Sequence, residues 1–206
     1  MRIVVFGASG KTGRLVVALA VKGGDDVVAF VRDASRQWFP DAVKIHQGSP
    51  SDAHAVEAAL VGADAVVSAL GPIAEETTTQ ISDATRTIVE VMERLGPRRI
   101  VIAANARVFS DSEASGPYAN VVTEHRRDAA ILRESALDWT VLAAPTLTDD
   151  PAIGSYVAVV DGKGPGRSIT RGDFATALLD AVGKDAWIRH MVGVTNPPVE
   201  AAEAAG

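Results

Sequence analysis

Short apolar runs alternate along the chain with longer segments in which apolar residues recur at helical spacing. Strands are expected where the apolar runs lie, at residues 3–6, 26–31, 42–46, 65–70, 99–104 and 139–143. Such alternation is typical of a parallel sheet with helices on both of its faces. The predicted order is βαβαβαβαβαβ, and the fold class is α/β with a doubly wound parallel sheet and a small C-terminal substrate lobe.

Two of the intervening helices have clear boundaries. Residues 79–95 carry Ile81, Ile88 and Met92 at helical spacing, and the pair Gly96-Pro97 ends the helix. A second helix is expected over residues 121–135. A chain of 206 residues is long enough for one well-packed core. We therefore predict a single domain over residues 1–206, with a C-terminal segment of about residues 145–195 on the substrate side.

The turn between the first strand and the first helix reads Gly7-Ala8-Ser9-Gly10-Lys11-Thr12-Gly13. Glycine at its first position permits a backbone angle closed to other residues, the second glycine lets the main chain approach a pyrophosphate, and the third allows close helix packing. The N–H groups at the helix start then face the phosphates. We predict a Rossmann-like, dinucleotide-binding fold; the alternative is a plain strand-to-helix turn. The expected cofactor-binding residues of this turn are Gly7, Ser9, Gly10, Lys11, Thr12 and Gly13.

The residues after the second strand bear on the choice of cofactor. Arg32 stands where an NAD enzyme usually has an acidic residue, and Arg36 follows one helical turn later. Guanidinium groups suit a 2′-phosphate, so we expect NADPH as the cofactor. The alternative is that both arginines are solvated. Asp33 could instead bind the ribose, which keeps NADH possible.

The ends of the later strands supply the remaining candidates, because ligands of such sheets lie beyond the carboxyl ends of the strands. Leu70 and Gly71 offer an apolar wall and a close backbone approach, and Asn105 can donate to and accept from a carboxamide. A plain strand exit and a structural turn residue are the respective alternatives.

His125 lies on the helix expected to face the site. It could donate a proton or bond a ribose hydroxyl; the alternative is a buried structural histidine. The remaining histidines show no metal-ligand spacing with a carboxylate, so we expect no metal.

Composition narrows the function classes. A net charge of −6 argues against a nucleic-acid partner, and the absence of cysteine excludes disulfides, thiolate nucleophiles and thiolate metal sites. No apolar stretch reaches membrane-spanning length. We expect a cytoplasmic protein that acts on a small planar molecule, has no nucleic-acid or membrane partner, and is a monomer or weak homodimer.

The chain resembles the atypical short-chain dehydrogenase/reductases of the NAD(P)H-binding, NmrA-like group, and within it the biliverdin-IXβ reductase/flavin reductase family. The glycine turn, Arg32 with Asp33, and Leu70 with Gly71 carry the cofactor half of the resemblance. Longer stretches carry the rest: residues 132–137 (Leu-Arg-Glu-Ser-Ala-Leu), 154–156 (Gly-Ser-Tyr), 161–167 (Asp-Gly-Lys-Gly-Pro-Gly-Arg) and 169–173 (Ile-Thr-Arg-Gly-Asp).

The resemblance also implies site residues. At the helix positions of the Tyr-x-x-x-Lys pair of short-chain dehydrogenases this chain has Val121 and His125. A serine and a histidine near the substrate in the biliverdin/flavin reductases match Asn105 and Thr146, so the candidate catalytic residues are His125, Asn105 and Thr146. Ala104 and Pro145 complete the expected cofactor-binding set.

Without the Tyr-x-x-x-Lys pair, the mechanism we expect is hydride transfer to a flat conjugated acceptor, with the proton taken from water. The acceptor would be a flavin, a quinone or a tetrapyrrole-like compound. Apolar residues expected to suit its pocket are Ala104, Val108, Phe109, Pro145 and Leu147. Two alternatives remain: an NmrA-like regulatory protein that senses NADP without turnover, and an NAD(P)-dependent isomerase or dehydratase of the same fold.

Overall fold

A computed structural model of the chain describes residues 1–36, 39–71, 78–116 and 118–198. Within these residues, a central sheet has the strand order β3-β2-β1-β4-β5-β6-β10-β8, and a small second sheet pairs β7 with β9. The strands are β1 Arg2–Phe6, β2 Asp26–Val31, β3 Val43–Gln47, β4 Ala65–Ser68, β5 Arg99–Asn105, β6 Asp138–Ala144, β7 Thr146–Thr148, β8 Val157–Val160, β9 Ser168–Thr170 and β10 His190–Thr195.

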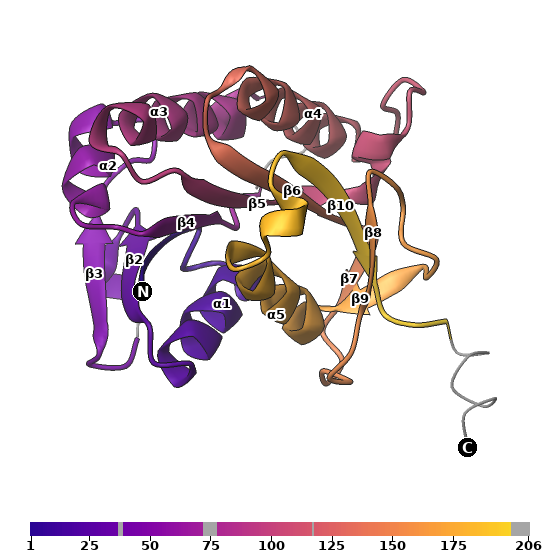
Figure 1. Ribbon diagram of the computed structural model, residues 1–206, viewed down its shortest axis with the longest axis horizontal. Helices are drawn as coiled ribbons and strands as arrows, with labels where there is room; N and C mark the ends of the chain where they lie inside the picture. The colour runs from indigo at the N-terminus through magenta and orange to yellow at the C-terminus, as the bar shows by residue number, and fades with distance from the viewer. Residues whose placement is uncertain (37–38, 72–77, 117, 199–206) are drawn as a thin grey trace.

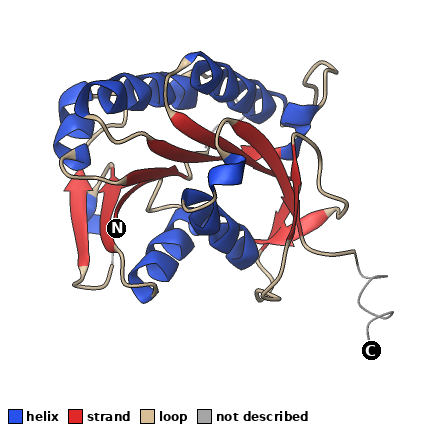
Figure 2. Ribbon diagram, in the orientation of Figure 1, coloured by secondary structure: helices blue, strands red, loops and turns tan. Residues whose placement is uncertain are grey.

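Helices cover both faces of the central sheet (Figures 1 and 2). The α-helices are α1 Lys11–Lys22, α2 Ala53–Leu60, α3 Gln80–Leu95, α4 Ala119–Glu134 and α5 Arg171–Val182. Short 3-10 helices occupy η1 Ala34–Arg36, η2 Ala106–Phe109 and η3 Asp185–Trp187. In the part of the chain described, no helix has the length and apolar character needed to cross a membrane.

Two apolar cores lie on opposite faces of the sheet. Helices α1 and α5 pack together on one face, where Val16, Phe174 and Leu178 are buried against the sheet. Helices α2, α3 and α4 cover the other face, where Ile88 and Leu132 are buried. Burial on both faces explains why the strands read as continuous apolar runs instead of alternating ones.

The order in which strands are added to the sheet reverses at β1, so that the topological switch point lies between β1 and β4. Strand β1 pairs in parallel with β2 on one side and with β4 on the other, and β4, β5 and β6 then follow in order. At such a switch point the connections leave toward opposite faces, which opens a crevice at the carboxyl ends of the strands. The glycine turn after β1 and the exits of β4, β5 and β6 border this crevice.

The fold class is confirmed, with differences at the margins. The fourth strand ends at Ser68 instead of residue 70, and α4 begins two residues earlier than expected, at Ala119. Pro72, expected at the exit of that strand, lies outside the described residues, as does the tail after Pro198.

Residues 145–195, expected on the substrate side, contribute to both sheets. They form β7 and β9 of the small sheet, and they also add β10 in parallel to β6 and β8 antiparallel to β10. The central sheet is therefore parallel except at the β8 edge. The sequence did not reveal β7, β8 and β9, because isolated runs of three or four residues carry too little periodicity.

Candidate functional site

The glycine turn has the geometry expected of a phosphate cradle. Gly7 has a φ of +73°, and a Cβ added there would lie 2.6 Å from the carbonyl oxygen of Ala69. A Cβ at Gly13 would collide with the Gly7 carbonyl oxygen. Gly7 and Gly13 are therefore required by backbone conformation and packing.

Gly10 is different, because its extended backbone angles suit any residue. A Cβ there would meet only the Gly7 carbonyl oxygen, at 3.3 Å. Helix α1 begins at Lys11 without a side-chain cap and without an acidic residue in its first turn, so its N–H groups remain available to an anion. Gly10 is exposed, so neither its backbone conformation nor its packing in the fold requires a glycine at this position.

A cleft of about 830 Å³ opens beside this turn, at the carboxyl ends of β4, β5 and β6. Helices α4 and α5 and strand β7 contribute to its walls. Eight of the predicted site residues line it: Thr12, Leu70, Gly71, Ala104, Asn105, His125, Pro145 and Thr146. Three strand ends, one helix and the glycine turn thus converge as the sequence suggested.

The remaining predicted residues lie beside the cleft or apart from it. Gly7, Ser9, Gly10, Lys11 and Gly13 form the turn next to the cleft without lining it. The expected apolar pocket is confirmed only in part: Ala104, Pro145 and Leu147 line the cleft. The prediction was wrong for Val108 and Phe109, which pack against the apolar core on the α4 side of the sheet, because the 3-10 helix η2 turns them inward.

Arg32 follows β2 directly and is exposed. No ion pair or hydrogen bond links its guanidinium to another described residue. One oxygen of the neighbouring Asp33, Oδ1, accepts hydrogen bonds from the backbone N–H and the hydroxyl of Ser35, at 3.0 and 2.7 Å. Asp33 therefore stabilises its own turn through Oδ1, and Arg32 is an exposed positive charge at this strand end. Arg36 closes η1, and its side chain lies outside the described part of the structure.

His125 is a buried and neutral imidazole. Its side chain is 7% exposed, and its Nδ1 accepts a hydrogen bond from the backbone N–H of Asn105 at 3.0 Å. Burial lowers the pKa of His125 to about 4, against a smaller opposing effect of the Glu124 charge. Because Nδ1 is an acceptor, the single proton of the neutral ring lies on Nε2, where it can be donated to a ligand in the cleft.

Asn105 serves the turn and the cleft at once. Its Oδ1 accepts a hydrogen bond of 2.9 Å from the backbone N–H of Arg107 and so caps η2. The capping role was the alternative interpretation of this residue, and it uses only the oxygen. The side-chain NH₂ group remains as a donor at the cleft.

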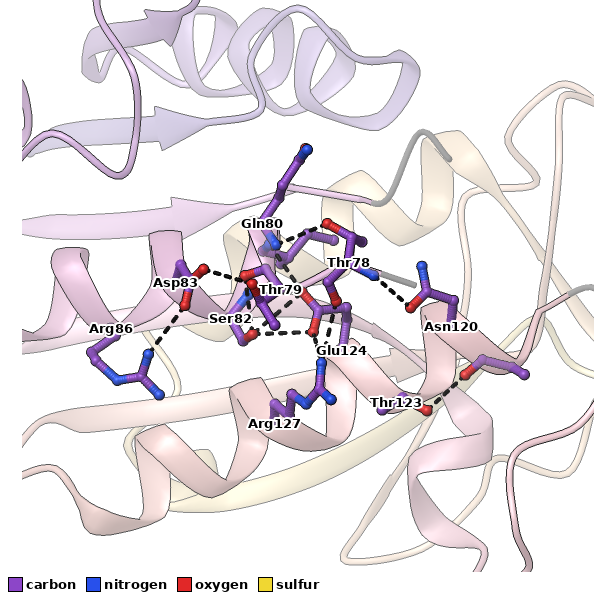
Figure 3. Close-up of polar contacts among 12 residues, drawn as sticks. Thr78, Thr79, Gln80, Ser82, Asp83, Arg86, Asn120, Thr123, Glu124 and Arg127 are labelled. Carbon is purple, nitrogen blue, oxygen red and sulfur yellow. Dashed lines mark hydrogen bonds and ion pairs between the residues drawn. The ribbon is translucent and has the colours of Figure 1, made fainter. Parts of the chain in front are cut away.

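Helix α4 is fixed to the start of α3 by a buried carboxylate (Figure 3). Glu124 is fully buried and accepts hydrogen bonds from the backbone N–H groups of Ile81 and Ser82, at 3.0 and 3.1 Å. Arg127 pairs with the same carboxylate at 2.8 Å and also donates to the carbonyl oxygen of Thr78. These contacts satisfy the free N–H groups at the α3 N-terminus and set the position of α4 relative to the sheet.

Tyr118 also lines the cleft, with 60% of its surface exposed, and was not among the predicted residues. With Val121 and His125 it forms an i, i+3, i+7 series on one face of α4. That helical spacing is the sequence signal that identifies Tyr118.

The C-terminal segment reaches the glycine turn through an ionic cluster. Asp149 accepts from Lys11 Nζ at 2.5 Å and from Arg171 Nε at 2.7 Å, and Arg171 also donates to the Thr12 hydroxyl. Hydrogen bonds from Lys11 and then Arg171 lower the pKa of Asp149 to about 2. Lys11, predicted to bind the cofactor, thus already has an acidic partner.

A second carboxylate holds the same segment in place. Asp173 accepts hydrogen bonds from the backbone N–H groups of Ile153 and Gly154 and from the side chains of Thr170 and Asn196. Burial opposes ionisation of Asp173, but these bonds outweigh it and lower its pKa. The stretches of residues 154–156 and 169–173 that carry the family resemblance therefore meet at one structural carboxylate.

Comparisons with known proteins identify the family and the fold of the chain. The chain matches the model of the NAD(P)H-binding family over residues 7–185. YwnB, an uncharacterized protein of Bacillus subtilis (strain 168), is 26% identical over 201 residues, which span 87% of this chain and 91% of YwnB.

Two solved structures share the fold. ChuY, an anaerobilin reductase from Escherichia coli O157:H7, has a TM-score of 0.81 at 23% identity, over 97% of this chain and 98% of its own. A short-chain dehydrogenase/reductase from Veillonella parvula DSM 2008, solved in complex with NADP, has a TM-score of 0.78 at 19% identity. The match covers 95% of this chain and 94% of that protein's chain. The chain therefore belongs to the NAD(P)H-binding family.

Proposed function

We propose that the chain is an NADPH-dependent oxidoreductase that reduces a flat conjugated acceptor, such as a flavin, a quinone or a tetrapyrrole-like compound. The observation that carries the proposal is the cleft itself, which joins the glycine turn to apolar walls, an exposed tyrosine ring and a neutral histidine. The size of the cleft, about 830 Å³, is in the range of pockets that bury small ligands. The fold shared with ChuY is consistent with a reductase.

Each wall of the cleft has a task in this proposal. A bound nicotinamide dinucleotide supplies the hydride. The N–H groups at the α1 start bind its pyrophosphate, and the Asn105 NH₂ group donates to its carboxamide or to the acceptor. His125 Nε2–H bonds a ribose hydroxyl. Ala104, Pro145 and Leu147 exclude water around the reacting rings, and the Tyr118 ring offers a face for stacking.

A flat conjugated acceptor suits a site without the Tyr-x-x-x-Lys pair. Reduced flavins and quinones take their proton readily from water, whereas an isolated ketone needs a positioned acid. The side chain of His125 is neutral near pH 7, because burial lowers its pKa to about 4. Holding two rings in reacting geometry can by itself contribute several kcal/mol.

The test is consumption of NADPH, followed by its near-ultraviolet absorbance, with FMN, riboflavin, naphthoquinones and linear tetrapyrroles. We expect one acceptor reduced for each NADPH oxidised. Tight binding of NADPH with no oxidation by any of these acceptors would contradict the proposal and support a sensor. Retention of the cofactor while a substrate is converted to a product of the same oxidation state would support an isomerase.

The preference for NADPH rests on Arg32, the exposed charge after β2. We expect Arg32→Ala to weaken NADPH binding at least about tenfold and to leave NADH binding nearly unchanged, because a charge-assisted bond to the 2′-phosphate is lost. Titration calorimetry with both cofactors provides the measurement, with Arg86→Ala on the exposed side of α3 as control. Equal losses for the two cofactors would rule out a 2′-phosphate contact.

A further inference from the structure

The charged side chains that line the cleft are all cationic in the described part of the chain. They are Arg107, Lys163 and Arg171. No aspartate or glutamate lines the cleft there, although the chain as a whole has 26 acidic and 20 basic residues. A positive cleft in an acidic protein raises the local concentration of anionic ligands.

Arg171 is already accounted for by the cofactor end of the cleft. It pairs with Asp149 and donates to Thr12 in the glycine turn. Its charge is therefore already paired with Asp149 beside the glycine turn, so Arg171 gives no information about the acceptor.

Arg107 lies at the opposite end. It follows β5, which is separated from β1 and its glycine turn by β4, a distance of about 10 Å at ordinary strand spacing. Its backbone N–H is held by Asn105, so the residue has a defined position. Its guanidinium is exposed and forms no ion pair or hydrogen bond with any described residue. The same holds for Lys163, in the turn between β8 and β9.

The nicotinamide end of the cofactor offers these two cations no acidic partner, because a carboxamide is neutral and the phosphates lie at the glycine turn. We propose that the acceptor carries an acidic group, a carboxylate or a phosphate. Arg107 binds this group through its planar guanidinium, and Lys163 binds it through its ammonium group. This inference rests on the proposed function and narrows it from flat acceptors in general to anionic ones.

FMN and riboflavin provide the test, since they share one ring system and differ by a phosphate. The kcat/KM of each is measured with saturating NADPH, and the Kd of each for the NADPH-free protein is measured by flavin fluorescence. A naphthoquinone with and without a carboxylate side chain distinguishes carboxylate from phosphate. The variants are Arg107→Gln and Lys163→Gln, with Arg86→Gln, outside the cleft, as the control of equal charge change.

We expect the wild-type protein to prefer FMN over riboflavin by at least about tenfold in kcat/KM and in Kd. Arg107→Gln should remove most of that preference by weakening the binding of FMN, while the affinities for riboflavin and NADPH stay unchanged. Lys163→Gln should also lower the preference for FMN. Salt should reduce the preference in the wild type and in the control Arg86→Gln.

Equal use of FMN and riboflavin by the wild type, together with equal use of the two quinones, would overturn the inference and leave the reductase function standing. An anion preference that survives Arg107→Gln and Lys163→Gln would overturn the assignment to these residues. Failure of every acceptor to oxidise NADPH would instead overturn the proposed function itself.

Discussion

His125 places a neutral ring where a short-chain dehydrogenase has a lysine. With its pKa lowered to about 4, only about 0.1% of the side chain is protonated at pH 7. We expect His125→Gln, which keeps a polar group of similar reach, to change flavin turnover by less than about tenfold, because general acid catalysis usually contributes about a hundredfold or more. The kcat of the wild type should also show no change between pH 6 and 9 that arises from protonation of His125.

Steady-state kinetics with FMN across this pH range provide the measurement, and His54→Gln on α2 is the matched control. A thousandfold loss of kcat with NADPH affinity intact would make His125 the proton donor. A fall in the wild-type kcat near pH 6.5 that the variant does not show would lead to the same conclusion.

The packing of α3 against α4 contains a second carboxylate besides Glu124. Asp128 is 2% exposed, and its Oδ1 has no hydrogen-bond partner among the described residues. Burial raises the pKa of Asp128 to about 7; a hydrogen bond with Thr85 opposes this rise, and the Glu124 charge adds to it. The folded state therefore holds a proton that the unfolded chain, with a pKa near 3.8, releases.

The stability of the fold should consequently fall as the pH rises from about 4 to about 7, and remain low above that range. We expect Asp128→Asn, which is neutral at every pH, to raise Tm by several degrees at pH 8 and by much less at pH 5. Thermal unfolding followed by circular dichroism measures the difference, with Asp83→Asn on the exposed face of α3 as control. An equal change in Tm at both pH values would contradict a raised pKa for Asp128.

The elements show where sequence patterns are sufficient and where they are not. The runs that form β1 to β6 are long enough to be recognised, and the glycine turn and the residues after β4, β5 and β6 followed from the rule that ligands lie at strand ends. The capping of α3 by Glu124 could not be predicted, because it joins residues more than forty positions apart through a side chain and the main chain. Tyr118, by contrast, could be predicted, because it shares a helical face with Val121 and His125.

Across the whole molecule, Asp149 links the first strand-helix unit to the C-terminal segment through Lys11 and Arg171. Its carboxylate neutralises two cations next to the glycine turn. We expect Asp149→Asn to strengthen NADPH binding about threefold to tenfold, since the freed cations raise the positive potential where the phosphates bind. The change in Tm should stay within about 2 °C, because exposed ion pairs contribute little to stability.

Titration calorimetry at low and high salt measures the affinity, and Asp150→Asn, the exposed neighbour, is the control. Weaker binding of NADPH by Asp149→Asn would show that the carboxylate instead positions Lys11 and Arg171 for the phosphates.

The hydrogen bond from the Asn105 backbone N–H to His125 also restricts which side chains can take the place of the histidine. A lysine at position 125 offers only donors, so it would leave the Asn105 N–H without an acceptor, at a cost of about 1–3 kcal/mol if no water replaces it. Placing tyrosine and lysine at positions 121 and 125 would therefore not be enough to install a Tyr-x-x-x-Lys pair in this site. The backbone at the exit of β5 would have to change as well, so that the Asn105 N–H keeps an acceptor.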